Sequence, residues 1–420
     1  MNKVAFVTLG CKLNFSESST LARQFAAKGY EEVAPGPDVD IFVVNTCSVT
    51  EHADKKCRNL IRKLHKLAPA AKIVVTGCYA QLKPREILSI EGVDLVVGAD
   101  RKGDLVRLAL EGQNGSHGYS CEIDAVESFF PAYSSGERTR SFLKVQDGCD
   151  YHCAYCTVPL ARGKSRNLPV AQLVAQAHAI ASQGILEVVL TGVNTGDFGK
   201  STGESFLSLL QALNDVPGIE RYRISSIEPN LLTEDILRWI ATGTKFLPHF
   251  HIPIQSGCDR TLKAMHRRYT AAQFEAKIAL IRDILEKPGE RYTRVFFGID
   301  VIVGFPGETD EDFEETYQLL ERIRPAYLHI FPYSRRAGTP AAERPDQVQE
   351  SVKTARATRL QALSDQLHAS FSAANTGRPA KVLFESTLKG GKMFGYTENY
   401  LRVERPYDKE LIGKIVDVTL

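Results

Sequence analysis

Three cysteines in the middle of the chain are spaced for an iron-sulfur cluster. Cys149, Cys153 and Cys156 follow one another as Cys-x3-Cys-x2-Cys, and no fourth cysteine comes directly after them. A closed structural metal site has four protein ligands, whereas a 4Fe-4S cluster held by three thiolates leaves one iron open to another molecule. A zinc site completed by His152 or Cys258 is the alternative, but zinc ligands usually come in more widely spaced pairs. The spacing therefore favours a 4Fe-4S cluster with an open iron.

A second set of three cysteines follows three apolar runs near the N-terminus. Each run is followed directly by a cysteine: residues 4–10 by Cys11, residues 41–46 by Cys47 and residues 73–77 by Cys78. In a parallel sheet the carboxyl ends of the strands share one edge, where open α/β folds bind ligands. A single cysteine at a strand end is more often a small core residue, but three at equivalent positions predict a second three-cysteine cluster.

The remaining cysteines are not expected to hold a cluster. Cys57 falls on the apolar stripe of a helix expected over residues 51–67, so it belongs to the core. Cys121 sits in a polar connector and is assigned no role. If Cys258 does not complete a zinc site, we expect it to be an inert thiol.

The helix expected over residues 51–67 carries basic residues on its other face. Lys55 and Arg62 lie there, with Arg58 close by. Such a charge run is often only a solvated helix face. Because the helix follows directly after Cys47, we treat these three residues as candidate contacts to a nucleic-acid phosphate backbone.

The composition is that of a globular protein with metal or redox chemistry. A chain of 420 residues suffices for roughly two to three domains. No run of about 18 apolar residues and no signal-peptide pattern is present, which predicts a cytoplasmic protein without a membrane partner. Nine cysteines in such a chain indicate metal or redox chemistry, because a reducing compartment disfavours disulfides. The formal net charge of +2 neither requires nor excludes a nucleic-acid partner.

The order of apolar runs predicts an α/β protein in three parts. Residues 1–112 alternate strands with helices, as a parallel α/β sheet does, and residues 113–138 have the polar, Gly-rich composition of a linker. Residues 139–372 repeat a strand-then-helix pattern, which predicts a partial (β/α)6 barrel with a trailing helix. Residues 376–420 change to short strands between Gly and charged turns, which predicts a small β-barrel.

The expected barrel strands place the central cysteines at the reactive end of the barrel. We expect the strands near residues 142–146, 186–190, 221–225, 249–254, 295–303 and 326–331. Reactive groups of such barrels lie at the carboxyl ends of the strands. Cys149 follows directly after the first strand, as this arrangement requires.

Motifs along nearly the whole chain resemble those of the radical S-adenosylmethionine (SAM) methylthiotransferases. The matching segments are Leu9-Gly10-Cys11-Lys12-Leu13-Asn14, Asn45-Thr46-Cys47, Thr76-Gly77-Cys78, the central cysteine triad, and residues 223–229, 251–257 and 300–309. The resemblance implies an N-terminal cluster-binding domain, a radical SAM barrel and a C-terminal TRAM domain, which is a small RNA-binding β-barrel.

The resemblance also implies two 4Fe-4S clusters with different tasks. In this family one cluster, here that of Cys149, Cys153 and Cys156, cleaves SAM to a 5′-deoxyadenosyl radical. The open iron of the other, here that of the N-terminal cysteines, carries the sulfur that is methylated by a second SAM and transferred. An electron donor such as flavodoxin or ferredoxin is then a necessary partner.

Several residues at the barrel mouth become candidates for binding SAM. Tyr155 matches the aromatic residue that the superfamily places near the adenine. The other candidates are Gly192 and Asn194 after the second strand, Ser225 and Glu228 after the third, and Gln255 and Ser256 after the fourth. Buried polar groups at a barrel mouth need partners that a ligand can supply. Packing of Tyr155, an ordinary Gly-containing turn and helix capping by Ser225 are the competing roles.

The residues after Cys11 indicate the substrate. Lys12-Leu13-Asn14 resembles the branch that acts on N6-threonylcarbamoyladenosine in tRNA, next to the anticodon on its 3′ side. The branch acting on isopentenyladenosine usually has Gln-Met-Asn there, and the branch acting on a ribosomal-protein aspartate has Pro-Lys-Asn. These two branches, and a zinc-dependent RNA-binding module without catalysis, are the alternatives. The threonylcarbamoyl carboxylate requires a cation, for which Arg267 and Arg268 are the candidates.

Overall fold

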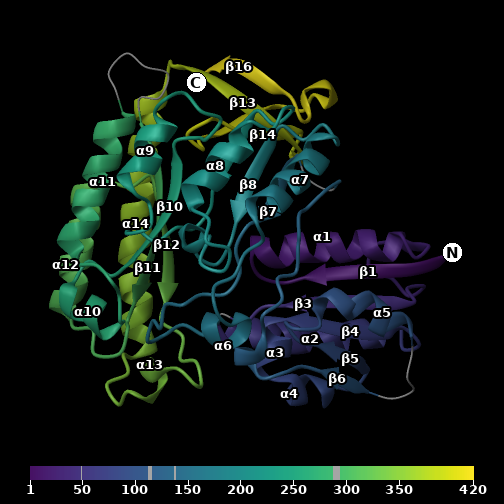
Figure 1. Cartoon of the computed structure of the whole chain (residues 1–420). Helices are drawn as coiled ribbons and strands as arrows, with labels where there is room; N and C mark the ends of the chain where they lie inside the picture. The colour runs from purple at the N-terminus through teal and green to yellow at the C-terminus, as the bar shows by residue number, and fades with distance from the viewer. Residues whose placement is uncertain (49, 112–115, 137–138, 287–293) are drawn as a thin grey trace.

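The computed structural model describes residues 1–48, 50–111, 116–136, 139–286 and 294–420. Figure 1 shows a parallel sheet with its helices at the N-terminus, a curved set of parallel strands surrounded by helices in the middle, and a small antiparallel sheet at the C-terminus. The predicted mixed α/β fold, with its three parts in this order, is confirmed.

The N-terminal part is a parallel sheet with the strand order β2-β1-β3-β4-β5-β6. Its strands are β1 (Asn2–Thr8), β2 (Tyr30–Glu32), β3 (Ile41–Thr46), β4 (Lys72–Gly77), β5 (Val93–Val97) and β6 (His117–Tyr119). The helices are α1 (Lys12–Ala26), α2 (Glu51–Leu67), α3 (Cys78–Leu82), α4 (Pro84–Leu88) and α5 (Leu105–Leu110). Side chains of α1 and α5 pack on one face of the sheet and those of α2 on the other, so β3 is buried along its whole length and is continuously apolar.

Strand β6 lies inside the segment that we expected to be a linker. It pairs with β5 and forms the edge of the sheet. A strand of three residues is too short to show a periodic pattern in the sequence. Residues 113–115 and 137–138 of the expected linker lie outside the described part of the chain.

The middle part is built from two parallel sheets, β7-β8-β9 and β10-β11-β12, that lie side by side. The strands are β7 (Arg140–Lys144), β8 (Glu187–Thr191), β9 (Arg221–Ile224), β10 (His249–Gln255), β11 (Phe296–Val303) and β12 (Tyr327–Pro332). Single bridges, such as that between Ser226 and His251, join the two halves. The strands lie within about two residues of the predicted positions, and side chains of both halves form one apolar core.

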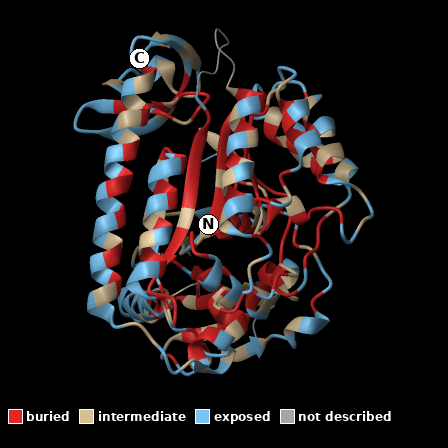
Figure 2. Ribbon diagram, turned by 90° about the vertical axis from the view of Figure 1, so that its left-hand side faces the viewer, coloured by how far each residue is buried: buried red, intermediate tan, exposed pale blue. Residues whose placement is uncertain are grey.

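Helices surround this partial barrel. They are α6 (Val158–Arg162), α7 (Val170–Ala181), α8 (Phe206–Asn214), α9 (Glu234–Ile240), α10 (Asp259–Ala264), α11 (Ala271–Leu285), α12 (Asp310–Ile323), α13 (Pro340–Glu343) and α14 (Glu350–Asn375). Figure 2 shows buried strands inside and helices with an exposed outer face. Helix α1 of the N-terminal part packs along β7, where Phe15 meets Phe142 edge to face with ring centroids 5.8 Å apart.

The C-terminal part is an antiparallel sheet with the order β15-β14-β13-β16. Its strands are β13 (Pro379–Lys389), β14 (Lys392–Tyr396), β15 (Arg402–Pro406) and β16 (Ile415–Thr419). Strand β15 begins only at Arg402, because Tyr400 lies in a turn with a φ of 62°. The sheet docks at the amino ends of β7 and β9, where Arg221 donates to the carbonyl of Lys381 at 2.7 Å.

A buried group of charges joins the N-terminal part to the barrel. Glu17 of α1 is fully buried and lies 2.6 Å from Lys102, 2.8 Å from Lys144 of β7 and 3.3 Å from Arg162 of α6. Burial alone would raise the pKa of Glu17, but these three cations outweigh it and hold the pKa well below its usual range. Asp147 accepts from Arg162 at 2.9 Å and completes the group. The two parts are therefore joined by ionised side chains that are all buried from solvent.

We expect Glu17→Gln to lower the free energy of unfolding by about 3 kcal/mol, because it leaves buried cations without their partner. Urea denaturation measures this difference. Glu31→Gln is the matched control, since Glu31 is exposed on β2 and its loss should change the free energy by less than about 0.5 kcal/mol. Equal stability of the two variants would contradict a structural role for the buried group.

Candidate functional site

The three N-terminal cysteines lie at neighbouring strand ends, as predicted. Cys11 precedes α1, Cys47 follows β3 and Cys78 begins α3 directly after β4. Strand β3 pairs with β1 on one side and β4 on the other, in a register that places the ends of the three strands at the same edge of the sheet. Cys47 is buried, whereas Cys11 is exposed.

Two glycines allow the cysteine loops to approach each other. Gly10 has a φ of 105° and Gly77 a φ of 98°, which other residues rarely adopt. A Cβ atom on Gly10 would lie 2.9 Å from the sulfur of Cys47, and one on Gly77 would lie 2.3 Å from the carbonyl oxygen of Thr46. The glycine before Cys11 and the glycine before Cys78 are therefore steric requirements of the site.

Asn14 holds the loops of Cys11 and Cys47 together. Its amide nitrogen donates to the carbonyls of Leu9 at 2.8 Å and Thr46 at 2.9 Å. Its amide oxygen accepts from Arg162 at 2.6 Å. The sequence motif contained Asn14, but its role depends on contacts between distant segments and could not be predicted from one loop.

The central triad lies in the loop between β7 and α6. The backbone N–H groups of Tyr151 and Val158 point at the sulfurs of Cys149 and Cys156, both at 3.4 Å. Arg267 reaches across the barrel and places its guanidinium 3.1 Å from the sulfur of Cys153. N–H donors directed at sulfur stabilise thiolate ligands of iron-sulfur clusters. All nine cysteines are free thiols, so both sets are available as ligands.

Two of the triad thiols, those of Cys149 and Cys156, need a bound cation to ionise. Burial raises the pKa of Cys149 and of Cys156 to about 12, and the nearby Cys153 adds to both shifts. Burial also raises the pKa of Cys78 in the other set, against the guanidinium of Arg162. Thiolate ligation by a cluster therefore releases protons from these sites.

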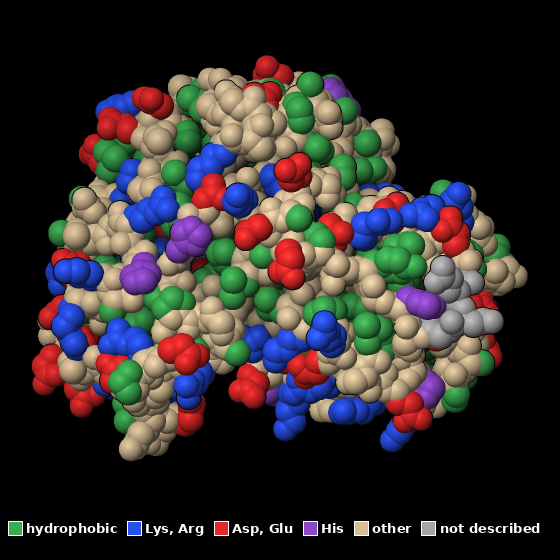
Figure 3. All heavy atoms as spheres, turned by 60° about the horizontal axis from the view of Figure 1, so that its bottom comes forward, with side chains coloured by type: hydrophobic (Ala, Val, Ile, Leu, Met, Phe, Trp, Pro, Cys, Tyr) green, Lys and Arg blue, Asp and Glu red, His purple; other side chains and the backbone are tan. Residues whose placement is uncertain are grey.

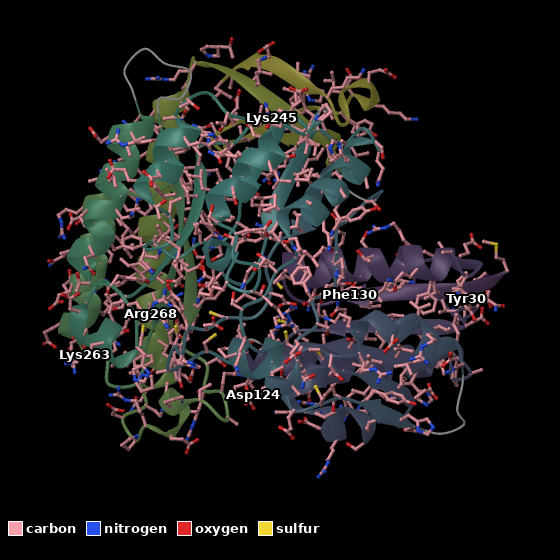
Figure 4. All side chains as sticks on the ribbon, viewed as in Figure 1. Tyr30, Asp124, Phe130, Lys245, Lys263 and Arg268 are labelled. Carbon is pink, nitrogen blue, oxygen red and sulfur yellow. The ribbon has the colours of Figure 1, made fainter. Side chains whose placement is uncertain are left out.

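The two cysteine sets meet at one junction between the N-terminal part and the barrel. Thr157, directly after Cys156, donates to the carbonyl of Ser48, directly after Cys47, at 3.4 Å. The side chain of Ser48 accepts from Arg336 at 2.7 Å. Figure 4 shows the side chains around this junction, with Arg268 on the barrel side and Phe130 toward the N-terminal part. The contacts of Thr157 and Arg336 with Ser48 therefore bring the two candidate cluster sites together at this junction.

The loop after β8 contacts the triad loop through Gln146, a residue that we did not predict. Its side-chain oxygen accepts the N–H groups of Val193 at 3.0 Å and Asn194 at 2.9 Å. A Cβ atom on Gly192 would lie 3.0 Å from that oxygen, so a larger residue would push the two loops apart. The available signal was a polar residue just before the triad, at the end of an apolar strand.

Two buried polar atoms near the triad have no hydrogen-bond partner among the described residues. They are the amide nitrogen of Asn194 and one carboxylate oxygen of Asp197. Asp197 is close enough to the triad to raise the pKa of Cys149, after burial itself. Because buried polar atoms are nearly always hydrogen-bonded, these two fit a ligand with both donors and acceptors, such as the amino-acid moiety of SAM.

Arg267 and Glu228 form an ion pair beside the triad, with 3% of the Arg267 side chain and 12% of the Glu228 side chain exposed. The guanidinium of Arg267 pairs with the carboxylate of Glu228 and lies 3.4 Å from the hydroxyl of Tyr155. We predicted Arg267 as a substrate contact and Tyr155 and Glu228 as SAM contacts, and the structure brings all three to the triad. Arg268 is exposed, with its guanidinium 3.9 Å above the ring of Tyr151.

The other predicted SAM contacts differ in position. Ser225 is buried at the end of β9. Gln255 has a φ of 65°, where the pairing of β10 with β11 shifts, and such strain is typical of ligand sites. Ser256 is buried, and its hydroxyl accepts the N–H of Cys258 and contacts the hydroxyl of Thr316, both at 3.2 Å. Ser256 thus supports the turn.

The remaining candidates lie outside the junction. Cys57 is fully buried in the apolar core, as predicted. Cys258 is buried and donates to Asp312 at 3.1 Å, and burial raises the pKa of its thiol to about 11. Lys55 and Arg62 are exposed on α2, but Arg58 pairs with Glu86 at 3.0 Å.

The chain is similar to known proteins over its whole length. It matches the Radical SAM superfamily over residues 143–320 and the uncharacterized protein family UPF0004 over residues 3–98. The threonylcarbamoyladenosine tRNA methylthiotransferases MtaB of Bacillus subtilis and Aquifex aeolicus are 40% and 36% identical, with all of this chain and 94% and 100% of theirs covered. A tRNA-2-methylthio-N(6)-dimethylallyladenosine synthase of Sphingopyxis alaskensis is 33% identical, with coverages of 98% and 94%.

A solved structure shares the fold. The radical S-adenosylmethionine methyltransferase TsrM from Kitasatospora setae, with cobalamin and a [4Fe-4S] cluster bound, superimposes with a TM-score of 0.58. The superposition covers 81% of this chain and 77% of that chain, at 15% sequence identity.

We expect Gly10→Ala to lower the iron content of the anaerobically reconstituted protein from about eight to about four atoms per chain, because a Cβ atom would displace Cys47 from one of two 4Fe-4S sites. Iron and labile-sulfide assays measure this. Gly29→Ala is the matched control, since Gly29 also has a positive φ but no atom within 4 Å of an added Cβ. Full iron content in Gly10→Ala would refute the steric argument.

Proposed function

The chain belongs to the radical SAM methylthiotransferases, and we propose that it converts N6-threonylcarbamoyladenosine in tRNA to its 2-methylthio derivative. The observation that carries the proposal is the meeting of two three-cysteine sites at one junction, in a chain that aligns from end to end with relatives named for this reaction. The relatives named for dimethylallyladenosine are less similar, at 33% and 34% identity. A protein substrate has no support among these relatives.

Each cysteine set fits a 4Fe-4S cluster with an open iron. When bound, the triad cluster supplies the electron that cleaves SAM, and the cluster of Cys11, Cys47 and Cys78 carries the sulfur for transfer. The protein's own part is to hold the two sets in one space. Asn14 fixes two of the cysteine loops, and Arg267 stabilises the thiolate of Cys153.

The SAM site is proposed from the unsatisfied groups at the barrel mouth. We assign the amide N–H groups of Asn194, as donors, to the SAM carboxylate. The carboxylate of Asp197 pairs with Lys200 at 2.7 Å through one oxygen, and we assign its other oxygen, as an acceptor, to the SAM ammonium group. Gly192 allows the backbone of the loop after β8 to come close to the amino-acid moiety of SAM. Tyr155 and Glu228, which both contact Arg267, border the proposed SAM site. Ser225 and Gln255 are proposed to complete the lining after the third and fourth strands.

Transfer RNA contacts are proposed on two surfaces. The domain of residues 376–420 has the antiparallel strands of an RNA-binding barrel, and Lys55 and Arg62 are exposed on α2. Lys and Arg side chains on the face shown in Figure 3 stand in groups separated by acidic side chains. This distribution favours phosphate contacts at a few places over a continuous basic surface.

A reducing compartment suits this chemistry. We propose the cytoplasm as its location, because free cysteines at cluster sites and a tRNA substrate both require it. Flavodoxin or ferredoxin is the proposed electron donor. Among the described residues, no helix has the length and apolar character needed to cross a bilayer.

Two triple variants should separate the tasks of the clusters. Replacing Cys149, Cys153 and Cys156 by Ala should abolish SAM cleavage while about four irons remain, because the two sites are independent. Replacing Cys11, Cys47 and Cys78 by Ala should leave formation of 5′-deoxyadenosine intact but give no methylthio product. Chromatography of the reaction products measures both. Normal product from the second variant would rule out its cluster as the sulfur carrier, and Cys57→Ala should be fully active.

The substrate is tested with two matched tRNAs, one with threonylcarbamoyladenosine and one with isopentenyladenosine. We expect the purified enzyme to methylthiolate the first at least about tenfold faster, because a site that binds polar groups rejects an apolar analogue. Mass spectrometry of the digested nucleosides measures the product. Modification of the second tRNA alone would refute the substrate and leave the reaction type standing.

A further inference from the structure

A cavity of about 300 Å³ lies where the three parts of the chain meet. Its wall includes Cys11 and Lys12 at the start of α1, Arg140 and Arg223 of the barrel strands, and Tyr400 of the C-terminal part. The cavity therefore begins at a ligand of the proposed sulfur-carrying cluster and continues along basic side chains. Of these residues, only Cys11 was predicted to be part of the site.

Lys12 is a cation without an acidic partner. Its side chain is exposed at the cavity wall, and no carboxylate of the described residues lies within 4.0 Å of its ammonium group. Arg140 and Arg223 are held in place from behind. Arg140 lies 2.8 Å from Glu385, and Arg223 lies 2.7 Å from Glu187. The two guanidinium groups are thus fixed parts of the wall, whereas Lys12 is available to a ligand.

The positive potential in the cavity shifts the pKa values of Tyr400 and His249. Burial alone would raise the pKa of Tyr400, but Arg140, Lys12 and Arg223 outweigh burial and lower it. The ring of His249 stacks on that of Tyr400 with centroids 4.2 Å apart, and burial, Arg223 and Lys12 keep it neutral. An anion would relieve the repulsion among these cations.

The cavity is in the right place for one part of the proposed substrate. In adenine, C2 and C6 both neighbour N1, so a base whose C2 faces the sulfur-carrying cluster extends its N6 substituent from the same edge. Cys11 is a proposed ligand of that cluster, and Lys12 is the next residue. A carboxylate on the N6 substituent then lies within reach of Lys12, while Tyr400 and neutral His249 offer hydrogen bonds to a hydroxyl group.

We propose that this cavity binds the threonylcarbamoyl group of the substrate nucleoside, with Lys12 as the cation for its carboxylate. The inference rests on the proposed function and names the residue that selects the substrate. It gives Lys12 the part for which we first considered Arg267 and Arg268. The guanidinium of Arg267 is instead bound by Glu228 beside the triad, and that of Arg268 lies over Tyr151.

A phosphate of the tRNA backbone is the other anion that could bind Lys12. The test therefore uses three anticodon stem-loop RNAs with the same phosphates. One carries threonylcarbamoyladenosine, the second carries its threoninol analogue, in which a hydroxymethyl group replaces the carboxylate, and the third carries unmodified adenosine. We expect the wild-type enzyme to bind the first about tenfold more tightly than the second, as one charge-assisted hydrogen bond allows.

Lys12→Gln should remove this tenfold preference and leave the affinity for the other two RNAs unchanged, whereas Lys12→Arg should retain most of it. Lys28→Gln, an exposed residue just beyond the other end of α1, is the matched control and should behave as wild type. Iron content and 5′-deoxyadenosine formation verify that each variant keeps its clusters.

The outcomes separate the two claims. If Lys12→Gln weakens all three RNAs equally, the anion is a backbone phosphate and the carboxylate assignment is overturned. If the wild type methylthiolates the threonylcarbamoyl RNA and Lys12→Gln keeps the preference, the cavity assignment falls and the proposed function stands. If the wild type does not methylthiolate that RNA, both fall.

Discussion

The buried charges around Glu17 decide whether the two cysteine sets can act on one molecule. One set belongs to the N-terminal sheet and the other to the barrel, so chemistry between them requires a fixed distance between these two parts of the chain. Glu17 provides this by binding Lys144 and Arg162 of the barrel while it also binds Lys102 of its own part. Arg162 extends the link to Asn14, which holds the loops of Cys11 and Cys47.

Around this link, each part of the chain contributes one requirement of the reaction. The N-terminal sheet brings three distant cysteines together, because its parallel strands end at one edge and two glycines let their loops close. The barrel presents the triad and the unsatisfied atoms of Asn194 and Asp197 at its mouth. The C-terminal part closes the opposite end of the barrel and contributes Tyr400 to the basic cavity. Substrate selection is thus located at the basic cavity, and radical chemistry at the triad.

Local features of the sequence could be predicted, and features formed by distant segments could not. The triad is adjacent in sequence, and α2 has the bounds that were expected for the helix with the apolar stripe. The N-terminal set required only the rule that parallel strands end at one edge. By contrast, Arg267 lies 114 residues from Cys153, and its role appears only when the barrel closes. The short strand β6 and the turn at Tyr400 gave no periodic signal.

The central claim is that two open clusters at one junction place a methylthio group on C2 of threonylcarbamoyladenosine in tRNA. Nucleoside mass spectrometry of total tRNA from cells with and without this gene tests it most directly. We expect the 2-methylthio form of threonylcarbamoyladenosine to disappear without the gene and the unmethylthiolated nucleoside to accumulate in its place. An unchanged level of that form, or loss of the 2-methylthio form of isopentenyladenosine instead, would contradict it.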